Sequence, residues 1–490
     1  MAPPRSESTS KSGRSSRRKN WEKCLTVVIF LQSISIIAVF EKHLLNVKEK
    51  LKYGQEEIKA TKIHDTKHRQ YQYRDDDPNN DGLNSNAIDG GRQERPLPFS
   101  FSACLLIKDG NILLPEWLAY HYTVLPLRRL IVGVDPLSHT DPKQIFDSYG
   151  SIGMDISIWK NDSFWVNGYE AHEKKDYPIT NETDHEGLRL RHRYRQLVFY
   201  KSCMQQLHDE NQTWTVLIDV DEYLAFNYYE EQEGPPTWCK KNVTCAEDYA
   251  KSIQDGTHPR TLLDRSPTAT VAEHIGKHGV DKNYDGVDKP CVIFGRYLFV
   301  SKESSSSREE IQRGLDSDFN ATLFQTYRYR HRSPLSSGYQ MGKSIVDVSR
   351  YDGRDLTNIH RPLGKFCTGN NAYVHNAAMS FRVHHYIGSW ETFRRPGFDT
   401  RGKGVFDNVV FDKRNNVKNL VVDNTTPRYS SSENSTWLTQ FAKLVGKEKA
   451  LELSQKIRVR EEMEMDKVIA ELANGAKLHD WDKLNKKPPK

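Results

Sequence analysis

The sequence lacks a large excess of charge of either sign, any internal repeat and any glycine-rich phosphate-binding loop. Its 71 Lys and Arg residues nearly balance 65 Asp and Glu residues, and a formal net charge of +6 does not point to a nucleic-acid partner. Gly342 and Lys343 stand without the glycine-rich stretch of a Walker motif, which argues against that type of ATP site. With 37% hydrophobic and 10% aromatic residues, the chain can still form a real core.

Long hydrophobic runs are also scarce, and the one that stands out is CLTVVIFLQSISIIAVF, residues 24–40. It contains no charged residue and is close to the minimum length of a membrane-spanning helix, roughly 17 residues. The basic residues that precede it predict a cytoplasmic N-terminus under the positive-inside rule. We therefore expect a cytoplasmic tail (1–23), a single-pass type II signal anchor (24–40) and a luminal remainder. A cleaved signal peptide is the alternative.

Cysteines and asparagines that follow the apolar run fit a luminal location. The even number of cysteines after residue 40 suggests disulfides in an oxidising compartment, with buried free thiols an equal alternative for Cys104 and Cys203. The short loop between Cys239 and Cys245 suggests a local pair. Each N-x-[ST] glycosylation sequon predicts a surface position. All of the sequons lie after the apolar run, at Asn161, Asn181, Asn211, Asn242, Asn320, Asn424 and Asn434.

The rest of the chain changes character at about residue 99. The polar segment 41–98 has almost no apolar periodicity and is typical of a stem or linker. From residue 99 to 435, short apolar runs alternate with helix-compatible patterns, which predicts an α/β domain with a mostly parallel sheet flanked by helices. The expected strands include FSACLLI, LRRLIVGV, DISIW, WTVLI, CVIFGRYLFV and MSFRVHHYIGSW. A polar insertion is expected near 228–290, and helices with a basic tail over 436–490.

The segment TWTVLIDVDEYLAF contains the strongest candidate site. Residues 216–218 form an apolar run typical of a buried strand, and Asp219, Asp221 and Glu222 begin where it ends. In an open α/β sheet, ligands bind at the carboxyl ends of the strands, and alternation places Asp219 and Asp221 on one side. Two adjacent carboxylates repel unless a cation lies between them, and oxygen ligands suit Mg²⁺ or Mn²⁺. Other D-x-D pairs, such as Asp316 with Asp318, follow no buried strand and are interpreted as surface loops.

The run CLLIKDGNILLPEWLAYHYTVLPLRRLIVGVDPLSHTD resembles the opening pattern of glycosyltransferase family 92 and related GT-A-fold glycosyltransferases. The family pattern is K-N-E, E-W, Y-H, a strand and D-x-x-S-x-x-D, and this chain has K-D-G in place of K-N-E. The matching residues are Lys108, Glu116, Trp117, Tyr120, His121, Asp135, Ser138 and Asp141. Arg195 with Gln196 and the segment HYIGSWE (385–391) also fit, so the likeness covers the region from about residue 100 to about 400.

The resemblance implies a GT-A-like fold that transfers a hexose, such as galactose, from a UDP-sugar donor to a glycan acceptor with inversion at the anomeric carbon. It implies a Golgi or other secretory-pathway membrane glycoprotein. The residues that would bind the nucleotide sugar are Asp135, Asp141, Asp219 and Arg195. The residues that would bind Mn²⁺ or Mg²⁺ are Asp219, Asp221 and His385, although a core histidine is the alternative for His385.

Inverting transfer needs a general base for the acceptor hydroxyl, and the sequence offers two candidates. Glu391 follows HYIGSW, next to a tryptophan able to stack on a sugar, although a surface glutamate is the simpler reading. Glu222 is the other candidate, either as base or as a support for the metal. Two other functions stay open: a non-enzymatic luminal glycan-binding protein with a degenerate transferase fold, and a metal-dependent phosphodiesterase.

Overall fold

The computed structural model describes part of the chain, and all of that part belongs to one compact unit, Arg92–Lys490. The described residues are 101–160, 185–226, 243–255, 290–302, 312, 315–333, 342–354, 356, 358–360, 362, 367–368, 381–389, 412, 415–417, 420–423 and 436–473. Within these ranges no helix is both long enough and apolar enough to cross a membrane. The expected anchor (24–40), the expected stem, most of the expected insertion and Glu391 lie outside them.

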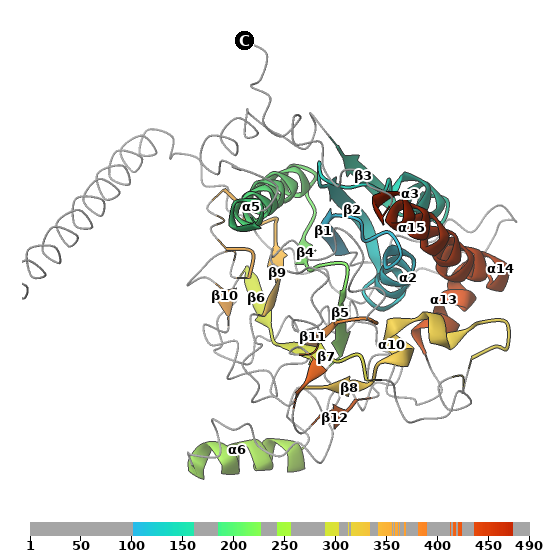
Figure 1. The fold of residues 1–490 in the computed structure, drawn as a ribbon. Helices are drawn as coiled ribbons and strands as arrows, with labels where there is room; N and C mark the ends of the chain where they lie inside the picture. The colour runs from blue at the N-terminus through green and yellow to red at the C-terminus, as the bar shows by residue number, and fades with distance from the viewer. Residues whose placement is uncertain are drawn as a thin grey trace, which may run out of the picture. The chain divides into compact units, whose positions relative to one another are not determined.

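The larger of two sheets has seven strands in the order β10-β6-β9-β4-β1-β2-β3 (Figure 1). Four neighbouring pairs are parallel, β10–β6, β4–β1, β1–β2 and β2–β3, while β9 runs antiparallel to both β4 and β6. The strands are β1 (Phe101–Ile107), β2 (Leu127–Val134), β3 (Asp155–Trp159), β4 (Trp214–Leu217), β6 (Cys291–Phe294), β9 (Lys343–Asp347) and β10 (Cys367–Thr368). Parallel strands with helical crossovers confirm the predicted α/β class.

A second sheet, which the sequence did not lead us to expect, has five strands in the order β12-β8-β7-β11-β5. Its strands are β5 (Glu222–Phe226), β7 (Arg296–Phe299), β8 (His331–Arg332), β11 (Phe381–Tyr386) and β12 (Val421–Val422). Among the described strands, the chain passes from the first sheet to the second three times: between β4 and β5, at Gly295 between β6 and β7, and between β10 and β11. The predicted single strand CVIFGRYLFV is therefore two strands that belong to different sheets.

Helices cover both faces of the larger sheet. Alternate residues of β1 point to opposite sides, so that Ala103 and Leu105 join one hydrophobic cluster and Cys104 joins another. The first cluster includes side chains of α2 (Leu114–Val124), α3 (Lys143–Gly150), α13 (Trp437–Val445) and the π-helical turn Leu451–Lys456, and the second includes those of α5 (His185–Asp209). The remaining helices are α6 (Val243–Gln254), Ala321–Leu323, α10 (Gln325–Arg328), α14 (Lys447–Ala450) and α15 (Ile457–Ala473).

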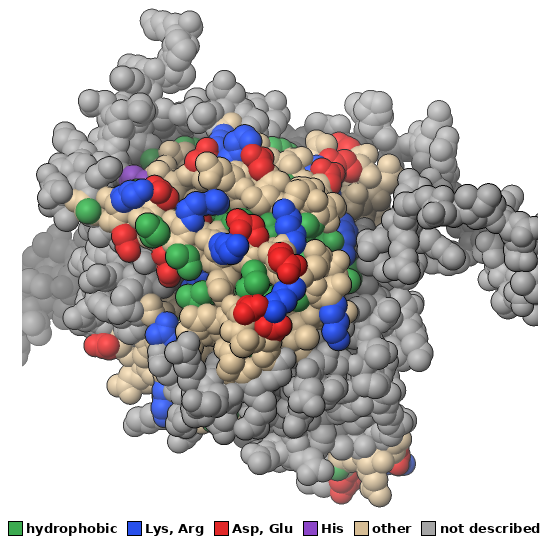
Figure 2. Space-filling view, turned by 90° about the vertical axis from the view of Figure 1, so that its right-hand side faces the viewer, with side chains coloured by type: hydrophobic (Ala, Val, Ile, Leu, Met, Phe, Trp, Pro, Cys, Tyr) green, Lys and Arg blue, Asp and Glu red, His purple; other side chains and the backbone are tan. Residues whose placement is uncertain are grey.

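The C-terminal helices are closely packed onto this core. The Thr436 side chain accepts a hydrogen bond from the Thr439 amide and caps α13, and Gly446 ends the helix with φ +87°, a conformation that favours glycine. Trp437 is fully buried, and its indole donates to the Thr326 hydroxyl at 3.0 Å. On the face that carries α3 and α15, the described Lys and Arg side chains alternate with Asp and Glu and form no extended patch of one charge (Figure 2).

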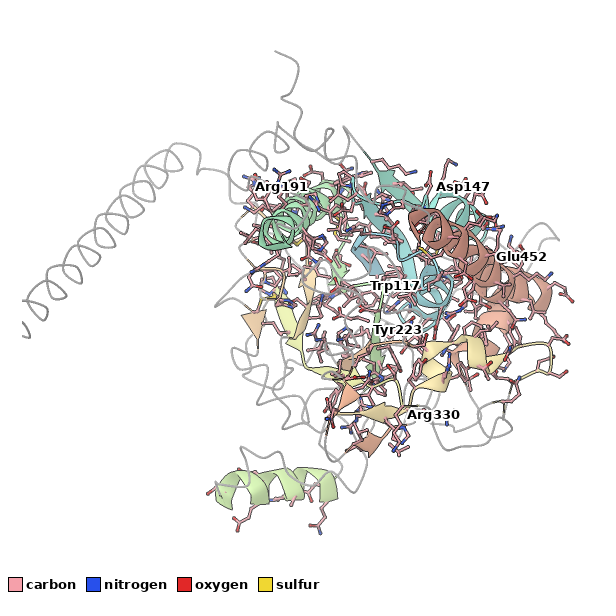
Figure 3. All side chains as sticks on the ribbon, in the orientation of Figure 1. Trp117, Asp147, Arg191, Tyr223, Arg330 and Glu452 are labelled. Carbon is pink, nitrogen blue, oxygen red and sulfur yellow. A yellow bond between two sulfur atoms is a disulfide. The ribbon has the colours of Figure 1, made fainter. Side chains whose placement is uncertain are left out.

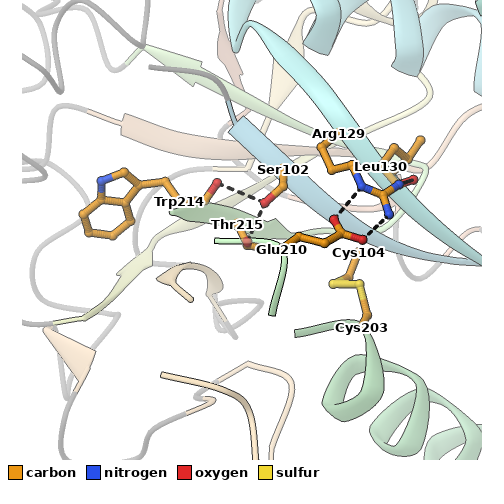
Figure 4. The surroundings of a disulfide bond; sticks show 8 residues. All are labelled: Ser102, Cys104, Arg129, Leu130, Cys203, Glu210, Trp214 and Thr215. Atoms are coloured by element: carbon orange, nitrogen blue, oxygen red, sulfur yellow. Dashed lines mark hydrogen bonds and ion pairs between the residues drawn. A yellow bond between two sulfur atoms is a disulfide. The ribbon is translucent and has the colours of Figure 1, made fainter. Parts of the chain in front are cut away.

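Two disulfides settle the choice that the sequence left open for the cysteines. Cys104 of β1 is bonded to Cys203 of α5 (Figure 4), and Cys291 of β6 is bonded to Cys367 of β10. Both bonds lie in the hydrophobic cluster beneath α5. Disulfides persist in oxidising compartments, so this chemistry fits a luminal domain. The suggested pair Cys239–Cys245 lies outside the described residues, because Cys239 and the side chain of Cys245 are not described.

Candidate functional site

The turn that carries the D-V-D-E sequence lies at the carboxyl end of β4, where the chain leaves the first sheet for the second. Val216, Leu217 and Ile218 are buried, as expected of a central strand. The strand order places β2 and β3 on one side of β1 and β4 on the other, so the direction of winding reverses between β1 and β4. In doubly wound sheets, ligands bind at the carboxyl edge beside such a reversal. The predicted position of the acidic residues is therefore the position that this topology favours for a site.

Helix α2 holds this turn in place through its aromatic residues (Figure 3). The Trp117 indole donates a hydrogen bond to the Asp219 carbonyl at 3.2 Å, and the Tyr120 hydroxyl donates to the Leu224 carbonyl at 2.9 Å. His121 donates from Nδ1 to the Trp117 carbonyl and accepts the Leu224 amide at Nε2, which requires the neutral ring. Burial lowers the pKa of His121 to about 3. Trp117, Tyr120 and His121 of the sequence pattern thus hold the backbone on either side of the acidic residues.

Glu116, the residue before Trp117 in the E-W pair, connects α2 to the C-terminal part of the chain. Its carboxylate accepts the Gln325 amide, the Thr326 amide and the Thr326 hydroxyl at 2.8–2.9 Å, and Arg458 of α15 lies 3.5 Å away. Burial raises the pKa of Glu116, although Arg458 and these hydrogen bonds oppose the shift. The contacts give Glu116 a structural task at the beginning of α10.

Asp221, Glu222 and His385 come together at the junction of β5 and β11, which are antiparallel with His385 opposite Glu222. One ligand atom from each lies within 4.8 Å of the others, and His385 Nε2 is 3.1 Å from Asp221 Oδ2. His385 Nδ1 is buried and has no hydrogen-bond partner among the described residues. Its neighbour His384 points the other way, where its Nε2 accepts a 2.6 Å hydrogen bond from Arg382. Of the two adjacent histidines, His385 is therefore the one that reaches the acidic turn.

Glu222 is held by two cations that we did not identify in the sequence as site residues. Its carboxylate contacts Arg296 at 2.8 Å and Lys343 at 3.0 Å, and it accepts the Asp219 amide at 2.9 Å. Burial alone would raise the pKa of Glu222, but Lys343 and Arg296 outweigh it and hold the pKa far below the ordinary value. A carboxylate bound by three donors is a poor proton acceptor in this conformation.

Lys343, at the start of β9, joins Asp219 to Glu222. Only 1% of its side chain is exposed, and its ammonium lies 2.6 Å from Asp219 Oδ2. The Asp219 side chain is 39% exposed; its partial burial and the neighbouring carboxylates of Glu222 and Asp221 raise its pKa, while Lys343 opposes the rise. In the sequence, Lys343 is a single lysine before a short apolar run, and we considered it only as part of a phosphate-binding loop. Its role depends on β9 lying beside β4.

The loop after β2 contains a second charge cluster. Asp135 is fully buried: Oδ2 contacts Arg195 Nε at 3.0 Å and His192 Nδ1 at 3.3 Å, and Oδ1 accepts the Leu137 amide. Burial would raise the pKa of Asp135, but Arg195 and His192 hold it far below its usual range. Asp141 lies apart, largely exposed and 2.5 Å from Lys160. Asp135 and Arg195 are therefore brought together as predicted residues, and Asp141 is not part of their cluster.

Asp109, which we did not predict as a site residue, organises the same loop from the end of β1. Its carboxylate accepts the amides of His139 and Thr140 at 2.6 and 2.9 Å, and it also contacts His139 Nδ1 at 2.9 Å. Its φ of +50° is a left-handed conformation that aspartate tolerates better than most residues. The adjacent Gly110 has space for no side chain without adjustment, because an added Cβ would meet Val220 at 3.0 Å. The K-D-G segment thus holds the loop after β2 through Asp109 and lies against the acidic turn at Gly110.

The donor atoms of Asp221, Glu222 and His385 fit a hard divalent cation. This set differs from the predicted ligands in one residue. A carboxylate and an imidazole, with a second carboxylate nearby, suit Mn²⁺ or Mg²⁺. Glu222 completes the cluster in the place where we expected Asp219, whose carboxylate is directed to Lys343. Asp316 and Asp318, one of the alternative D-x-D pairs, both pair with Lys447 at the surface.

The predicted base Glu391 lies outside the described residues. No protein-family model, no curated protein and no solved structure matches this chain.

Proposed function

We propose that this chain is a metal-dependent glycosyltransferase of a Golgi or other secretory-pathway membrane, similar to glycosyltransferase family 92 and built on a GT-A-like domain. In this proposal it is a single-pass type II protein that moves a hexose from a UDP-sugar to a glycan acceptor with inversion. The observation that carries the proposal is the pairing of Asp221 with His385 at the carboxyl edge of the sheet, beside the reversal of winding. The two disulfides support an oxidising compartment.

Asp221 and His385 would hold Mn²⁺ or Mg²⁺, because their ligand atoms lie close together and neither side chain contacts a lysine or arginine among the described residues. The bound cation would offset the negative charge of the departing diphosphate. Asp219, the Asp135 and Arg195 cluster and Asp141 stay the candidates for contacts with the nucleotide. In the described conformation, Asp135 would act through Arg195 and the loop rather than directly, because its own carboxylate is buried.

For the general base, Glu391 is our proposal and Glu222 becomes a positioning residue. Glu222 accepts the Asp219 amide and is bound by Lys343 and Arg296, so it fixes the turn from which Asp221 projects. Its depressed pKa opposes proton uptake near neutral pH. Glu391 follows β11 by a few residues in the sequence, which keeps it close along the chain to His385.

The test is a screen of UDP-sugars with the purified full-length chain, with Mn²⁺ and with a chelator. We expect Mn²⁺-dependent release of UDP from one donor, and we expect Asp221→Asn to abolish it. Mn²⁺ affinity, measured without any sugar by titration calorimetry, should fall by more than roughly 10-fold in that variant. Asp147→Asn is the matched control, because Asp147 is an exposed aspartate on α3 whose side chain pairs with the exposed Lys143. Unchanged Mn²⁺ affinity in Asp221→Asn would contradict the proposal.

A second candidate is a non-enzymatic luminal glycan-binding protein with a degenerate transferase fold. The contact of Lys343 with Asp219 favours it, because a protein cation already neutralises one aspartate of the D-x-D pair. This candidate predicts that no UDP-sugar raises the melting temperature in the presence of Mn²⁺, whereas a bound donor must stabilise a transferase by mass action. A glycan array with the same preparation would then identify its ligand.

A further inference from the structure

Two of the seven glycosylation sequons lie among the described residues, and the structure treats their asparagines differently. Asn320 is partly buried, and its Oδ1 accepts hydrogen bonds from the amide and the hydroxyl of Thr322, which caps the short helix at Ala321. Asn211 is exposed, and within the described part of the chain its side chain has no hydrogen-bond partner. The side-chain amide of Asn211 is therefore accessible for modification, whereas the side chain of Asn320 is engaged in capping a helix.

The turn that presents Asn211 is firmly held on both sides. Glu210, directly before it, accepts two 2.7 Å hydrogen bonds from the guanidinium of Arg129 on β2. Earlier in α5, the disulfide between Cys203 and Cys104 anchors the helix to β1 (Figure 4). After it, the backbone oxygen of Thr213 accepts the Val348 amide at 2.9 Å. Asn211 itself has φ +58°, which asparagine adopts more readily than most residues. The side chain is thus presented outward by an ordered turn.

The turn also lies away from the candidate site. Asn211 precedes the amino end of β4, whereas Asp219 follows the carboxyl end of the same strand. A large group on Asn211 would project from the opposite edge of the sheet and would leave the acidic turn uncovered. The disulfides in the same domain support an oxidising compartment for this turn, and in such a compartment oligosaccharides are added to asparagine in N-x-[ST].

We propose that Asn211, in the sequon Asn211-Gln212-Thr213, carries an N-linked oligosaccharide. The donor class is an oligosaccharide linked to a lipid diphosphate, supplied by the secretory pathway. A bond forms between Asn211 Nδ2 and the anomeric carbon of the first sugar, while the bond from that carbon to the diphosphate oxygen breaks. The diphosphate leaves with the bonding electron pair, and the amide nitrogen releases one proton. This modification is independent of any transfer that the chain itself catalyses.

The experiment uses the full-length chain produced in eukaryotic cells and mass spectrometry of its peptides. Enzymatic removal of N-linked glycans in ¹⁸O-labelled water should convert Asn211 to ¹⁸O-labelled aspartate. Thr213→Ala should abolish this label and lower the apparent mass on a gel by one glycan, whereas Thr213→Ser, which preserves the sequon, should retain both. Thr213→Ala keeps the backbone bond to Val348, so its folding is checked by the melting temperature.

Asn211→Asp is a second variant, because aspartate also tolerates the left-handed conformation but cannot accept the sugar. It should show the same loss of one glycan as Thr213→Ala. An unmodified Asn211 peptide from a correctly folded wild-type chain would overturn the proposal. The same conclusion would follow if Thr213→Ala and wild type had equal mass.

Discussion

Asp135 follows β2 and Asp221 follows β4, the strands on either side of β1 in the larger sheet, and the two aspartates have opposite surroundings. Asp135 has no exposed side-chain surface and contacts Arg195, His192 and the Leu137 amide. Asp221 is 19% exposed, and its described side-chain partner is His385, whose buried Nδ1 has no hydrogen-bond partner among the described residues. The protein satisfies the charge of the first aspartate itself. The second is arranged as a group that an external cation would complete.

The difference shows why the same residue type serves two purposes at one edge. A buried carboxylate with matched cations fixes the loops that meet at a site, and removal of one partner leaves an uncompensated charge. A carboxylate that shares its space with an imidazole keeps ligand atoms accessible. The comparison predicts that changes at Asp135 damage stability, and that changes at Asp221 damage binding.

Asp135→Asn should have the largest effect of the variants, and that effect is on the free energy of unfolding. It leaves Arg195 buried without its carboxylate, and we expect a loss of about 3 to 5 kcal/mol in the free energy of unfolding. Asp221→Asn is the matched control and should change that free energy by less than about 1 kcal/mol, because its site is partly exposed. Urea denaturation followed by circular dichroism measures both. Equal losses in the two variants would show that Asp221 is also a structural residue.

Lys343→Met should have the next largest effect, because it removes the ammonium between Asp219 and Glu222. Arg296 still neutralises Glu222 and Asp219 is partly exposed, so we expect a loss of roughly 2 to 4 kcal/mol. A double-mutant cycle with Glu222→Gln isolates the interaction, and the double variant should be more stable than the sum of the single losses predicts. Strict additivity would mean that the close contact of Lys343 with Glu222 contributes no coupling.

His121, which packs behind the acidic turn, makes the stability depend on pH. His121 has a folded pKa of about 3, below its unfolded value of 6.5, so only the unfolded chain binds a proton between these values. Stability due to His121 is complete above about pH 6.5 and falls by about 1.4 kcal/mol per pH unit between pH 6 and pH 4. His121→Asn should reduce that slope. Tyr120→Phe, which removes a neighbouring hydrogen bond without a titrating group, should leave the slope unchanged.

Trp117→Phe should have the smallest effect, because it removes one hydrogen bond and a modest volume behind the turn. We expect a loss of about 1 to 2 kcal/mol in the free energy of unfolding. The Asp219 carbonyl would lose its fixed donor, so Mn²⁺ affinity should weaken by a few fold while the fold is retained. If Trp117→Phe lost this stability but bound Mn²⁺ as tightly as the wild type, Trp117 would support the core and not the geometry of the site.

Local patterns predicted most of the individual strands, and β1 and β2 are buried along almost their whole length. The segments FSACLLI, LRRLIVGV and DISIW form β1, β2 and β3 within the predicted segments, because apolar runs bounded by turn residues have few other stable conformations. The segment CVIFGRYLFV was wrong as one strand. Gly295 divides it between two sheets, and a local pattern carries no information about which partner each half meets.

The candidate site was predicted in part for the same reason. Asp219, Asp221 and Glu222 follow a buried strand in the sequence, and that adjacency survives folding. Arg296 and Lys343 are 74 and 121 residues from Glu222 and reach it only because β7 lies beside β11 and β9 lies beside β4. Asp109 was missed because an aspartate before a glycine is ordinarily a turn residue. No spacing in the sequence distinguishes these partners from other charged residues.

The sequence by itself determined the class of the fold, the buried strand that ends in acid, and the residue types able to bind a divalent cation, because apolar period and residue chemistry are local properties. The tertiary structure decided which carboxylates are neutralised and which stay open, and which cysteines are bonded. These outcomes depend on distances between residues far apart in the chain, and electrostatic and covalent interactions depend steeply on such distances. A list of residues in order cannot supply them.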